Sequence, residues 1–314
     1  MIVVTGAAGF IGSNLVRALN RRGRTDLLLV DDLSDGQKFR NLTDCDFLDY
    51  ADKDAFLARV VSGALAGPIE AIFHQGACSN TMEWNGRRML AENYEYSKAL
   101  HSFALAREIP LIYASSASVY GMGPVFREDP LLETPLNLYA WSKVLFDRWV
   151  RRHAEGARSQ VVGLRYFNVY GPGEALKGEM ASVAWKNHLQ LLDGDVVRLF
   201  ESSDGYGPGE QRRDFVYVDD VAAVNLWFLD HPRVSGIFNV GTGRTQTFND
   251  VARAVIAHHG RGRIEYVPFP AALRGSYQSF TQADISALRV AGCDIPFLTV
   301  EEGVSRYLKN LGGS

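Results

Sequence analysis

Cysteine is scarce in this sequence of 314 residues, which contains only Cys45, Cys78 and Cys293. Three widely spaced cysteines fit neither a disulfide framework nor a zinc site, so we expect reduced, buried thiols and no bound metal. An excess of positive charge is also missing, because the formal net charge is -3 and no basic run occurs. The chain therefore lacks the electrostatic footprint of a nucleic-acid-binding protein.

Long apolar runs are missing too, and no stretch approaches the length that crosses a bilayer. The chain enters an expected strand at its first residues, which leaves no room for a signal peptide. We therefore expect a cytoplasmic protein that does not bind membranes. What the sequence does contain is 46% hydrophobic residues, enough for one large α/β unit with an appended lobe.

A glycine-rich turn follows the first apolar run. Residues 2–4 predict a strand, and the sequence T-G-A-A-G-F-I-G at residues 5–12 leads into a helical pattern. We expect Gly6 to make the tight turn, Gly9 to allow a close approach, and Gly12 to pack helix against strand. Without side chains in the way, a diphosphate can reach the N–H groups at a helix N-terminus. The alternative is a loop that needs glycines only for its own turns.

A second buried strand, residues 27–30, ends at Asp31. An acid in this position is the typical partner of a cofactor ribose. Asp32 beside it argues for NAD, because a carboxylate repels a 2′-phosphate. Lys38 and Lys53 would instead neutralise such a phosphate, although a single lysine is more often a solvated surface charge.

Residues 71–74 predict a further strand, and Gln75, Gly76 and Ala77 follow it as another small-residue approach for the cofactor. We expect His74 to be packed in the core. A helix is expected from about Glu92 to Arg107. Asn93 near its start would bond a backbone carbonyl or the cofactor.

A second group of candidate residues starts where residues 110–114 predict a strand that leads to Ser116. Tyr139 and Lys143 lie four residues apart, on one face of an expected helix. A free tyrosine has a pKa of about 10, and both Lys143 and a positively charged nicotinamide would favour its phenolate. Tyr139 would then take an alcohol proton during hydride transfer, while Ser116 holds the same oxygen. Tyr-x-x-x-Lys alone is common on helices, so the order of the three motifs carries the hypothesis.

The distal half predicts a substrate lobe. Residues 160–172 predict a strand, after which the strand and helix alternation weakens, and residues 213–221 predict a strand and an acidic helix start. The predicted architecture is a Rossmann-type doubly wound parallel sheet over residues 1–170, rejoined around residues 213–243, with a smaller, interleaved substrate lobe mainly within residues 171–314. The substrate contacts that we predict are Ser116, Asn168, Glu179, Lys186, Phe200, Glu201, Ser202, Ser203, Arg213 and Tyr277.

Taken in order, these motifs resemble the extended short-chain dehydrogenase/reductase superfamily. Within it the chain is most similar, nearly end to end, to the ADP-L-glycero-D-manno-heptose 6-epimerase family of NAD-dependent epimerases and dehydratases. The stretches that carry this likeness are H-Q-G-A-C-S at residues 74–79, Glu83-Trp84, residues 177–184 and residues 277–284.

The resemblance implies a homo-oligomer, often a pentamer, that uses tightly held NADP to invert carbon 6 of ADP-D-glycero-β-D-manno-heptose, for the heptose supply of lipopolysaccharide core. It implies Lys177 as a second acid/base group beside Tyr139. The cofactor contacts that it implies are Gly6, Gly9, Phe10, Ile11, Gly12, Asp31, Asp32, Lys38, Lys53, Gln75, Gly76, Ala77, Cys78, Ser79, Asn93, Lys143, Val169 and Lys177.

The sequence departs from the family pattern at four positions. Asp32 and Glu92 stand where asparagine is usual, and Glu179 and Lys186 stand where serine and histidine occur in some members. NADP is favoured over NAD because Lys38 and Lys53 match the family's phosphate contacts.

Three other functions were weighed. A UDP-sugar 4-epimerase shares the serine, tyrosine and lysine but leaves Lys177 without a role. A nucleotide-sugar 4,6-dehydratase would carry Thr-Asp-Glu where this chain has Ser116-Ala117-Ser118. A dinucleotide-sensing module without catalysis would be expected to lose Tyr139 and Lys143.

Overall fold

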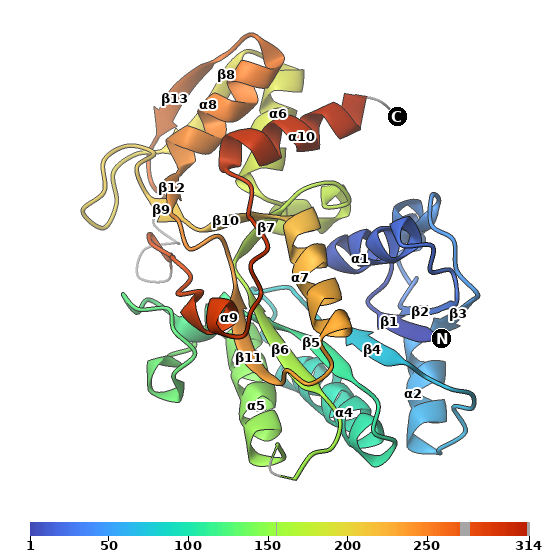
Figure 1. Ribbon diagram of the computed structural model, residues 1–314. Helices are drawn as coiled ribbons and strands as arrows, with labels where there is room; N and C mark the ends of the chain where they lie inside the picture. Colours follow the sequence, from blue (N-terminus) through green and yellow to red (C-terminus); the bar gives the residue numbers. More distant parts are fainter. Residues whose placement is uncertain (155, 271–276, 313–314) are drawn as a thin grey trace.

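The computed structural model describes residues 1–154, 156–270 and 277–312. Its centre is a parallel sheet of seven strands in the order β11-β6-β5-β4-β1-β2-β3 (Figure 1). These strands are β1 Ile2–Thr5, β2 Leu27–Asp31, β3 Asp49–Asp52, β4 Ala71–His74, β5 Leu111–Ser116, β6 Val161–Tyr166 and β11 Gly236–Val240. The sheet confirms the predicted Rossmann-type class.

Both faces of the sheet are covered by helices (Figure 1). Alternate side chains of the strands point to opposite faces, so Val4 and Leu29 belong to the core under α1 Phe10–Arg21 and α7 Val218–Asp230. Val3 and Leu28 belong to the core on the other side, where α2 Lys53–Val61, α4 Tyr96–Ala106 and α5 Leu138–Arg152 lie. Burial on both faces explains why these strands are apolar throughout.

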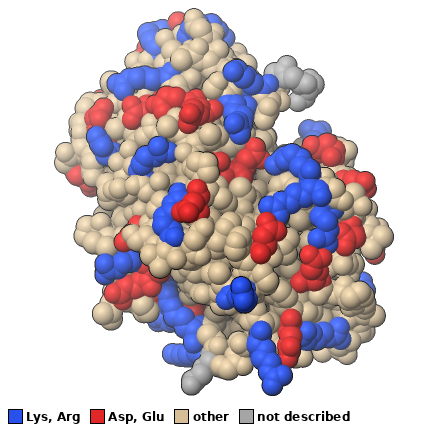
Figure 2. Space-filling view, viewed as in Figure 1, with Lys and Arg blue, Asp and Glu red and all other residues tan. Residues whose placement is uncertain are grey.

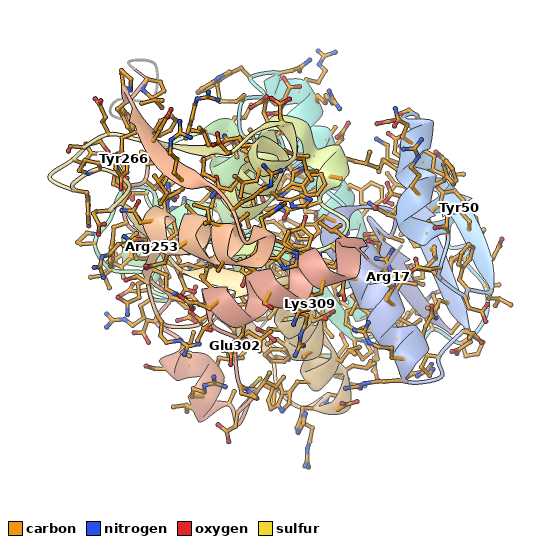
Figure 3. All side chains as sticks on the ribbon, turned by 90° about the horizontal axis from the view of Figure 1, so that it is seen from above. Arg17, Tyr50, Arg253, Tyr266, Glu302 and Lys309 are labelled. Carbon is orange, nitrogen blue, oxygen red and sulfur yellow. The ribbon has the colours of Figure 1, made fainter. Side chains whose placement is uncertain are left out.

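A second core lies between the elements of the distal lobe. It is built from α6 Val183–Asp193, β8 Val196–Phe200, α8 Phe248–His259, β13 Arg263–Val267 and α10 Val300–Gly312. β8 and β13 pair in parallel. Figure 3 shows α8, which carries Arg253, beside α10, which carries Glu302 and Lys309, while Arg17 on α1 lies on the sheet side.

Short elements connect the two parts. β7 Asn168–Tyr170 pairs with β10 Phe215–Tyr217, and β9 Arg212–Arg213 pairs with β12 Gln246–Thr247. The remaining short helices are α3 Gly86–Leu90, α9 Ser286–Val290, the π-helical turn η2 Ala91–Glu95, and the 3₁₀ helices η1 Gly36–Leu42, η3 Ala117–Tyr120, η4 Pro130–Leu132 and η5 Ala175–Met180.

Two local expectations need correction. The helix expected from about Glu92 begins at Gly86, because the Asn85 side chain caps it by accepting the Arg88 N–H. The π-helical turn η2 then interrupts it before α4. Of the cysteines, Cys78 and Cys293 are buried as expected, whereas Cys45 is partly exposed.

Positive and negative side chains are interspersed over the face of the molecule shown in Figure 2. Opposite charges are often paired there or elsewhere on the surface, as in the contact of Arg22 with Asp230 at 2.9 Å. Within the described ranges, no helix has both the length and the apolar character needed to span a bilayer.

Candidate active site

A long cleft opens at the carboxyl ends of β1, β2, β4 and β5. It consists of two cavities of about 880 and 730 Å³ that share lining residues, among them Gly6, Asp31 and Gly76. The first cavity is lined by the predicted residues Gly6, Gly9, Phe10, Ile11, Gly12, Asp31, Lys38, Gln75, Gly76, Ala77, Ser79, Ser116, Tyr139, Lys143, Val169, Lys177 and Glu179. The second adds Asp32, Lys53 and Cys78. Ligands of open parallel sheets bind at this end of the strands.

The glycine turn leaves no room for side chains. Gly6 has a φ of +67°, and a Cβ on it would stand 2.5 Å from the Gly76 nitrogen. A Cβ on Gly12 would lie 2.0 Å from the Gly6 carbonyl oxygen. Gly9 precedes α1 without a side-chain cap, so the first N–H groups of the helix are left for a ligand at the cleft. This geometry fits a dinucleotide diphosphate.

At the far end of the cleft, two lysines are held by carboxylates. Asp31 accepts the Ala8 N–H at 2.7 Å and forms an ion pair with Lys38. Lys53 lies 3.0 Å from Asp32 and 3.6 Å from Glu92. Hydrogen bonds from Ser34, and then the contact with Lys53, lower the pKa of Asp32 below its usual range. Both lysines thus lie at the cleft as predicted, each already beside a negative charge.

Ser116, Tyr139 and Lys143 converge from two neighbouring elements. Ser116 ends β5, and Tyr139 and Lys143 lie one turn apart on α5, whose first turn is capped by Asn137. The Lys143 Nζ donates to the Ala114 carbonyl at 2.8 Å and lies 5.9 Å from the centre of the Tyr139 ring.

Burial disfavours the charged forms of both Tyr139 and Lys143. It raises the pKa of Tyr139, against which the nearby Ser116 hydroxyl acts. It lowers the pKa of Lys143 to about 8, and the carboxylate of Asp147 partly offsets this. Groups with pKa values perturbed in this way and gathered in one cleft are typical of a catalytic site.

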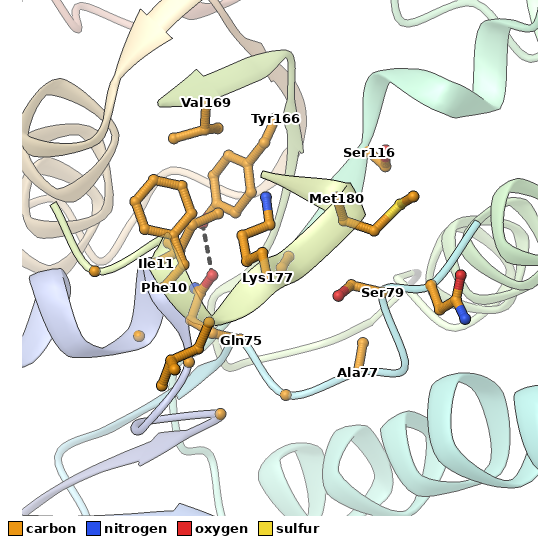
Figure 4. Close-up of a pocket in the computed structure, with 18 of the residues that line it drawn as sticks. Phe10, Ile11, Gln75, Ala77, Ser79, Ser116, Tyr166, Val169, Lys177 and Met180 are labelled. Atoms are coloured by element: carbon orange, nitrogen blue, oxygen red, sulfur yellow. Dashed lines mark hydrogen bonds between the residues drawn. The ribbon is translucent and has the colours of Figure 1, made fainter. Parts of the chain in front are cut away.

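Lys177 enters the same cavity from a different part of the chain. It lies on η5, and its Nζ is 5.1 Å from the centre of the Phe10 ring. Figure 4 shows its side chain pointing into the space that Phe10, Tyr166 and Met180 also border. Burial lowers its pKa, which makes it a better proton donor and acceptor near neutral pH.

A buried charged network supports β5 and α5 from behind. Arg165 on β6 is fully buried and forms ion pairs with Glu133 and, at 2.9 Å, with Asp147. Asp147 also accepts hydrogen bonds from the hydroxyls of Tyr113 and Ser115, each at 3.0 Å. Strand β5 and helix α5 are thereby fixed to each other beside the serine and tyrosine of the site.

We expect Arg165→Met to lower the free energy of unfolding by roughly 3–5 kcal/mol, because Glu133 and Asp147 lose the buried guanidinium that neutralises both. Urea unfolding monitored by circular dichroism measures this change. Arg151→Met is the matched control, since Arg151 also contacts Glu133, at 2.6 Å, but is partly exposed. Equal losses of stability in the two variants would contradict the account of the network.

Several predicted residues lie outside the cleft lining. Asn93 is buried, and its amide bonds the backbone of Cys78 and the Ser142 hydroxyl, so it supports the cleft wall from behind. Lys186 donates to the Glu179 carbonyl at 2.8 Å. The predicted site residues that line neither cavity are Asn93, Asn168, Lys186, Phe200, Glu201, Ser202, Ser203, Arg213 and Tyr277, all of which the structure describes.

Three of these residues form a cluster in the distal lobe. The Arg213 guanidinium lies 5.1 Å from the centre of the Tyr277 ring, whose centre is 6.4 Å from that of Phe200. Burial lowers the pKa of Arg213. A buried guanidinium over an aromatic ring suits a phosphate or a sugar. The role of these three residues as substrate contacts stays a prediction.

Sequence reasoning missed Tyr166, whose hydroxyl donates to the Gln75 side-chain oxygen at 3.0 Å (Figure 4). It also missed Asn80, Thr81 and Met180, which border the cavity. Tyr166 lies in the last position of an otherwise buried strand, which is a usable signal. Asn80 and Thr81 lie in a loop, and Met180 ends the short helix η5, so none of the three belongs to a periodic pattern.

A family model described as the NAD dependent epimerase/dehydratase family matches residues 2–241. This chain belongs to that family. The match covers the whole glycine turn, the tyrosine and lysine of α5, and Lys177.

Individual relatives of the family cover the chain almost completely. The chain is 58% identical to an ADP-L-glycero-D-manno-heptose-6-epimerase of Alkalilimnicola ehrlichii, over 98% of this chain and 96% of that protein. The solved Helicobacter pylori ADP-L-glycero-D-manno-heptose-6-epimerase is 31% identical, with a TM-score of 0.85 over 100% of this chain and 96% of that one. The Thermus thermophilus UDP-glucose 4-epimerase, solved in complex with NAD, is 26% identical, with a TM-score of 0.79 over 100% and 99%.

Proposed function

We propose that this chain epimerises ADP-D-glycero-β-D-manno-heptose to the L-glycero form at carbon 6. The observation that carries the proposal is that Tyr139 and Lys177, from separate elements, line one cavity together with the glycine turn. The 58% identity to a heptose epimerase supports the substrate class. Inversion needs two proton-transfer groups, because the oxygen on carbon 6 occupies a different position in each epimer.

The residues of the cleft have different roles in the proposed reaction. When bound, the nicotinamide supplies the hydride acceptor and donor. The phenolate oxygen of Tyr139 takes the proton of the 6-hydroxyl as the carbonyl forms, and Ser116 holds the oxygen on carbon 6 by a hydrogen bond. Rotation about the C5–C6 bond presents the other face of the carbonyl, and Lys177 Nζ then gives a proton to the oxygen. The reverse direction exchanges the two roles.

Lys143 favours the deprotonated form of Tyr139. Its position one helical turn away suits this role, although burial of the two groups opposes charge on both. The positive charge of an oxidised nicotinamide would act in the same direction as Lys143. The Ala114 carbonyl, which accepts from Lys143 at 2.8 Å, fixes the lysine in place.

We further propose NADP as the preferred cofactor, with NAD accepted. Lys38 and Lys53 line the second cavity at the end of β2, where the adenosine ribose of a dinucleotide lies in this fold. A 2′-phosphate would share these lysines with Asp31, Asp32 and Glu92. The assembly into homo-oligomers and the cytoplasmic location remain predictions from the sequence.

Lys53→Met is expected to weaken NADP binding about tenfold more than NAD binding, because hydrogen bonds to charged groups contribute about 1.5–3 kcal/mol. Asp32→Asn should act in the opposite direction and strengthen NADP binding. Isothermal titration calorimetry with both nucleotides measures the ratio. If Lys53→Met weakens NAD and NADP equally, Lys53 does not contact the 2′-phosphate.

The alternative function is that of a UDP-sugar 4-epimerase, because the Thermus thermophilus UDP-glucose 4-epimerase has a similar structure. Competing incubations with ADP-D-glycero-D-manno-heptose and with UDP-galactose separate the two, with each product identified by NMR. We expect conversion of the ADP-heptose alone. Conversion of UDP-galactose alone would replace the proposal and leave Lys177 without a role.

A further inference from the structure

Glu174 is a buried carboxylate that the proposed reaction does not use directly. It precedes η5, the short helix that carries Lys177, and it is 0% exposed. An acidic side chain at this depth is unusual unless a partner or a set of hydrogen bonds holds it. The pKa of Glu174 is raised by this burial and lowered by the hydrogen bonds that it accepts.

The Glu174 carboxylate joins the two ends of one loop. One oxygen accepts the Gly171 N–H at 3.1 Å, directly after β7. The same oxygen accepts the Ser182 hydroxyl at 2.8 Å, and the other oxygen accepts the Ser182 N–H. Ser182 is the residue that caps α6. A single side chain therefore closes the base of the segment from residue 171 to residue 182.

Lys177 lies in the middle of that closed segment. Its N–H donates to the Glu174 carbonyl at 2.9 Å, which fixes the lysine backbone to the same residue. Gly178 follows with a φ of +52°, so the chain turns back immediately after the lysine. The position and direction of the Lys177 side chain thus depend on the Glu174 carboxylate and on the turn at Gly178.

Glu174 also acts on Lys177 through its charge. Burial lowers the pKa of Lys177, the negative charge of Glu174 opposes this, and the positive charge of Lys186 on α6 adds to the lowering. From α1 the neutral Phe10 ring faces Lys177, and from α10 the Tyr307 hydroxyl lies against Glu174. Lys186 is itself within 3.8 Å of the Glu179 carboxylate.

We propose that Glu174 is the positioning residue of Lys177, closing its loop at both ends and supplying the counter-charge to its ammonium group. This inference rests on the proposed function, in which Lys177 transfers a proton. The two parts of the role separate experimentally, because a substitution can remove the charge while keeping the size of the side chain.

The test measures the pKa of Lys177 without any substrate. Lysines of the full chain are acetylated in competition across a range of pH, and the peptide that contains Lys177 is quantified by mass spectrometry. Glu174→Gln should lower the midpoint for Lys177 by roughly one pH unit, since a nearby opposite charge is lost. Lys98 on α4, which pairs with Glu95, serves as the internal reference. The kcat for ADP-heptose should fall by roughly tenfold or more, with KM little changed.

Asp214→Asn is the matched control. Asp214 is an equally buried carboxylate that accepts backbone N–H groups of Thr242, Gly243 and Ala283. Its replacement should reduce stability while the Lys177 midpoint stays at the wild-type value. If Glu174→Gln reduces stability in the same way and leaves the midpoint unchanged, Glu174 is only structural and the proposal is wrong.

Two further variants keep the test decisive. Glu174→Asp keeps the charge but shortens the reach, so the midpoint should stay closer to the wild type than in Glu174→Gln while kcat falls. Ser182→Ala removes one hydrogen bond of the loop closure and is used if Glu174→Gln does not fold, and it should lower kcat. An unchanged kcat in both variants would overturn the loop-closing role.

Absence of epimerisation by the wild type would instead overturn the proposed function, and the acetylation result would still stand.

Discussion

Replacing Tyr139 by phenylalanine is expected to lower the rate of epimerisation by roughly 10²-fold or more while the cofactor remains bound. The substitution removes one oxygen atom and nothing else from the turn of α5 that also carries Lys143. Since the ring of Tyr139 stays in place, the shape of the first cavity is preserved. The rate is measured by NMR of carbon 6, and cofactor retention by identifying the nucleotide that denaturation releases.

The control for Tyr139→Phe is Tyr113→Phe. Tyr113 is a buried tyrosine on β5 whose hydroxyl donates to Asp147 at 3.0 Å. It lines neither of the two cavities of the cleft. Its replacement should reduce stability by about 1 kcal/mol, the net contribution of one hydrogen bond, with far less effect on the rate. A Tyr139→Phe protein that turns over at the wild-type rate would remove Tyr139 from the mechanism.

The Lys177→Met variant is expected to lose a comparable factor, roughly 10²-fold or more. Methionine keeps most of the length and volume of the lysine side chain, so the cavity stays filled while the ammonium group and its contact with the Phe10 ring are lost. Because Tyr139 is intact, proton transfer at one position of the 6-oxygen remains possible and transfer at the other does not. The block therefore applies to inversion and leaves cofactor binding unaffected.

Lys177→Arg separates charge from proton transfer. Arginine keeps the positive charge but stays protonated at all working pH values, so this variant should be as slow as Lys177→Met. Recovery of the rate in Lys177→Arg would mean that Lys177 contributes only its charge. Normal turnover of Lys177→Met would exclude it from the reaction and reopen the case for a 4-epimerase.

The pH dependence of the rate follows from the same two groups. Burial lowers the pKa of Lys177 and raises that of Tyr139, so Lys177 loses its proton more readily, and Tyr139 less readily, than the isolated side chains. Lys177 must carry a proton in the step where it donates one, so activity in that direction should decline as the pH rises above the pKa of Lys177. Removing the carboxylate of Glu174 should move that decline to lower pH.

Much of the fold could be predicted because its strands are apolar on both faces. Residues 27–30 and 71–74 have no polar alternation, and the acidic start of α7 at Asp219 and Asp220 marks a helix N-terminus. The strand β3 escaped prediction because Asp49–Asp52 has charged residues at both ends and lies at the sheet edge. Edge strands bury less surface, so the hydrophobic signal is weak there.

The candidate site was predictable where a residue type is demanded by the backbone or by the chemistry. Gly6 and Gly12 are such positions, because any Cβ would collide with neighbouring backbone. Glu174 is the opposite case. Its importance depends on Gly171 and Ser182 coming together in space, which no local pattern reveals. Arg165 gave a usable signal, since a charged residue inside an apolar strand requires a buried partner.

The pairing of Lys53 with Asp32 and Glu92 likewise depends on three separate segments of the chain. The sequence predicts that acids and lysines lie near the end of β2, but it does not show which of them form ion pairs. Their meeting is decided by the packing of α2 and η2 around the second cavity. Cofactor choice is therefore a question for binding measurements.

The central claim is that a hydride leaves carbon 6 and returns to the opposite face of the same sugar. ADP-D-glycero-D-manno-heptose deuterated at carbon 6 tests this directly, with the purified protein in ordinary water and no added cofactor. The account predicts the L-glycero epimer with the deuterium still on carbon 6. Loss of the deuterium to solvent during inversion would contradict it, because the hydrogen would then have left as a proton.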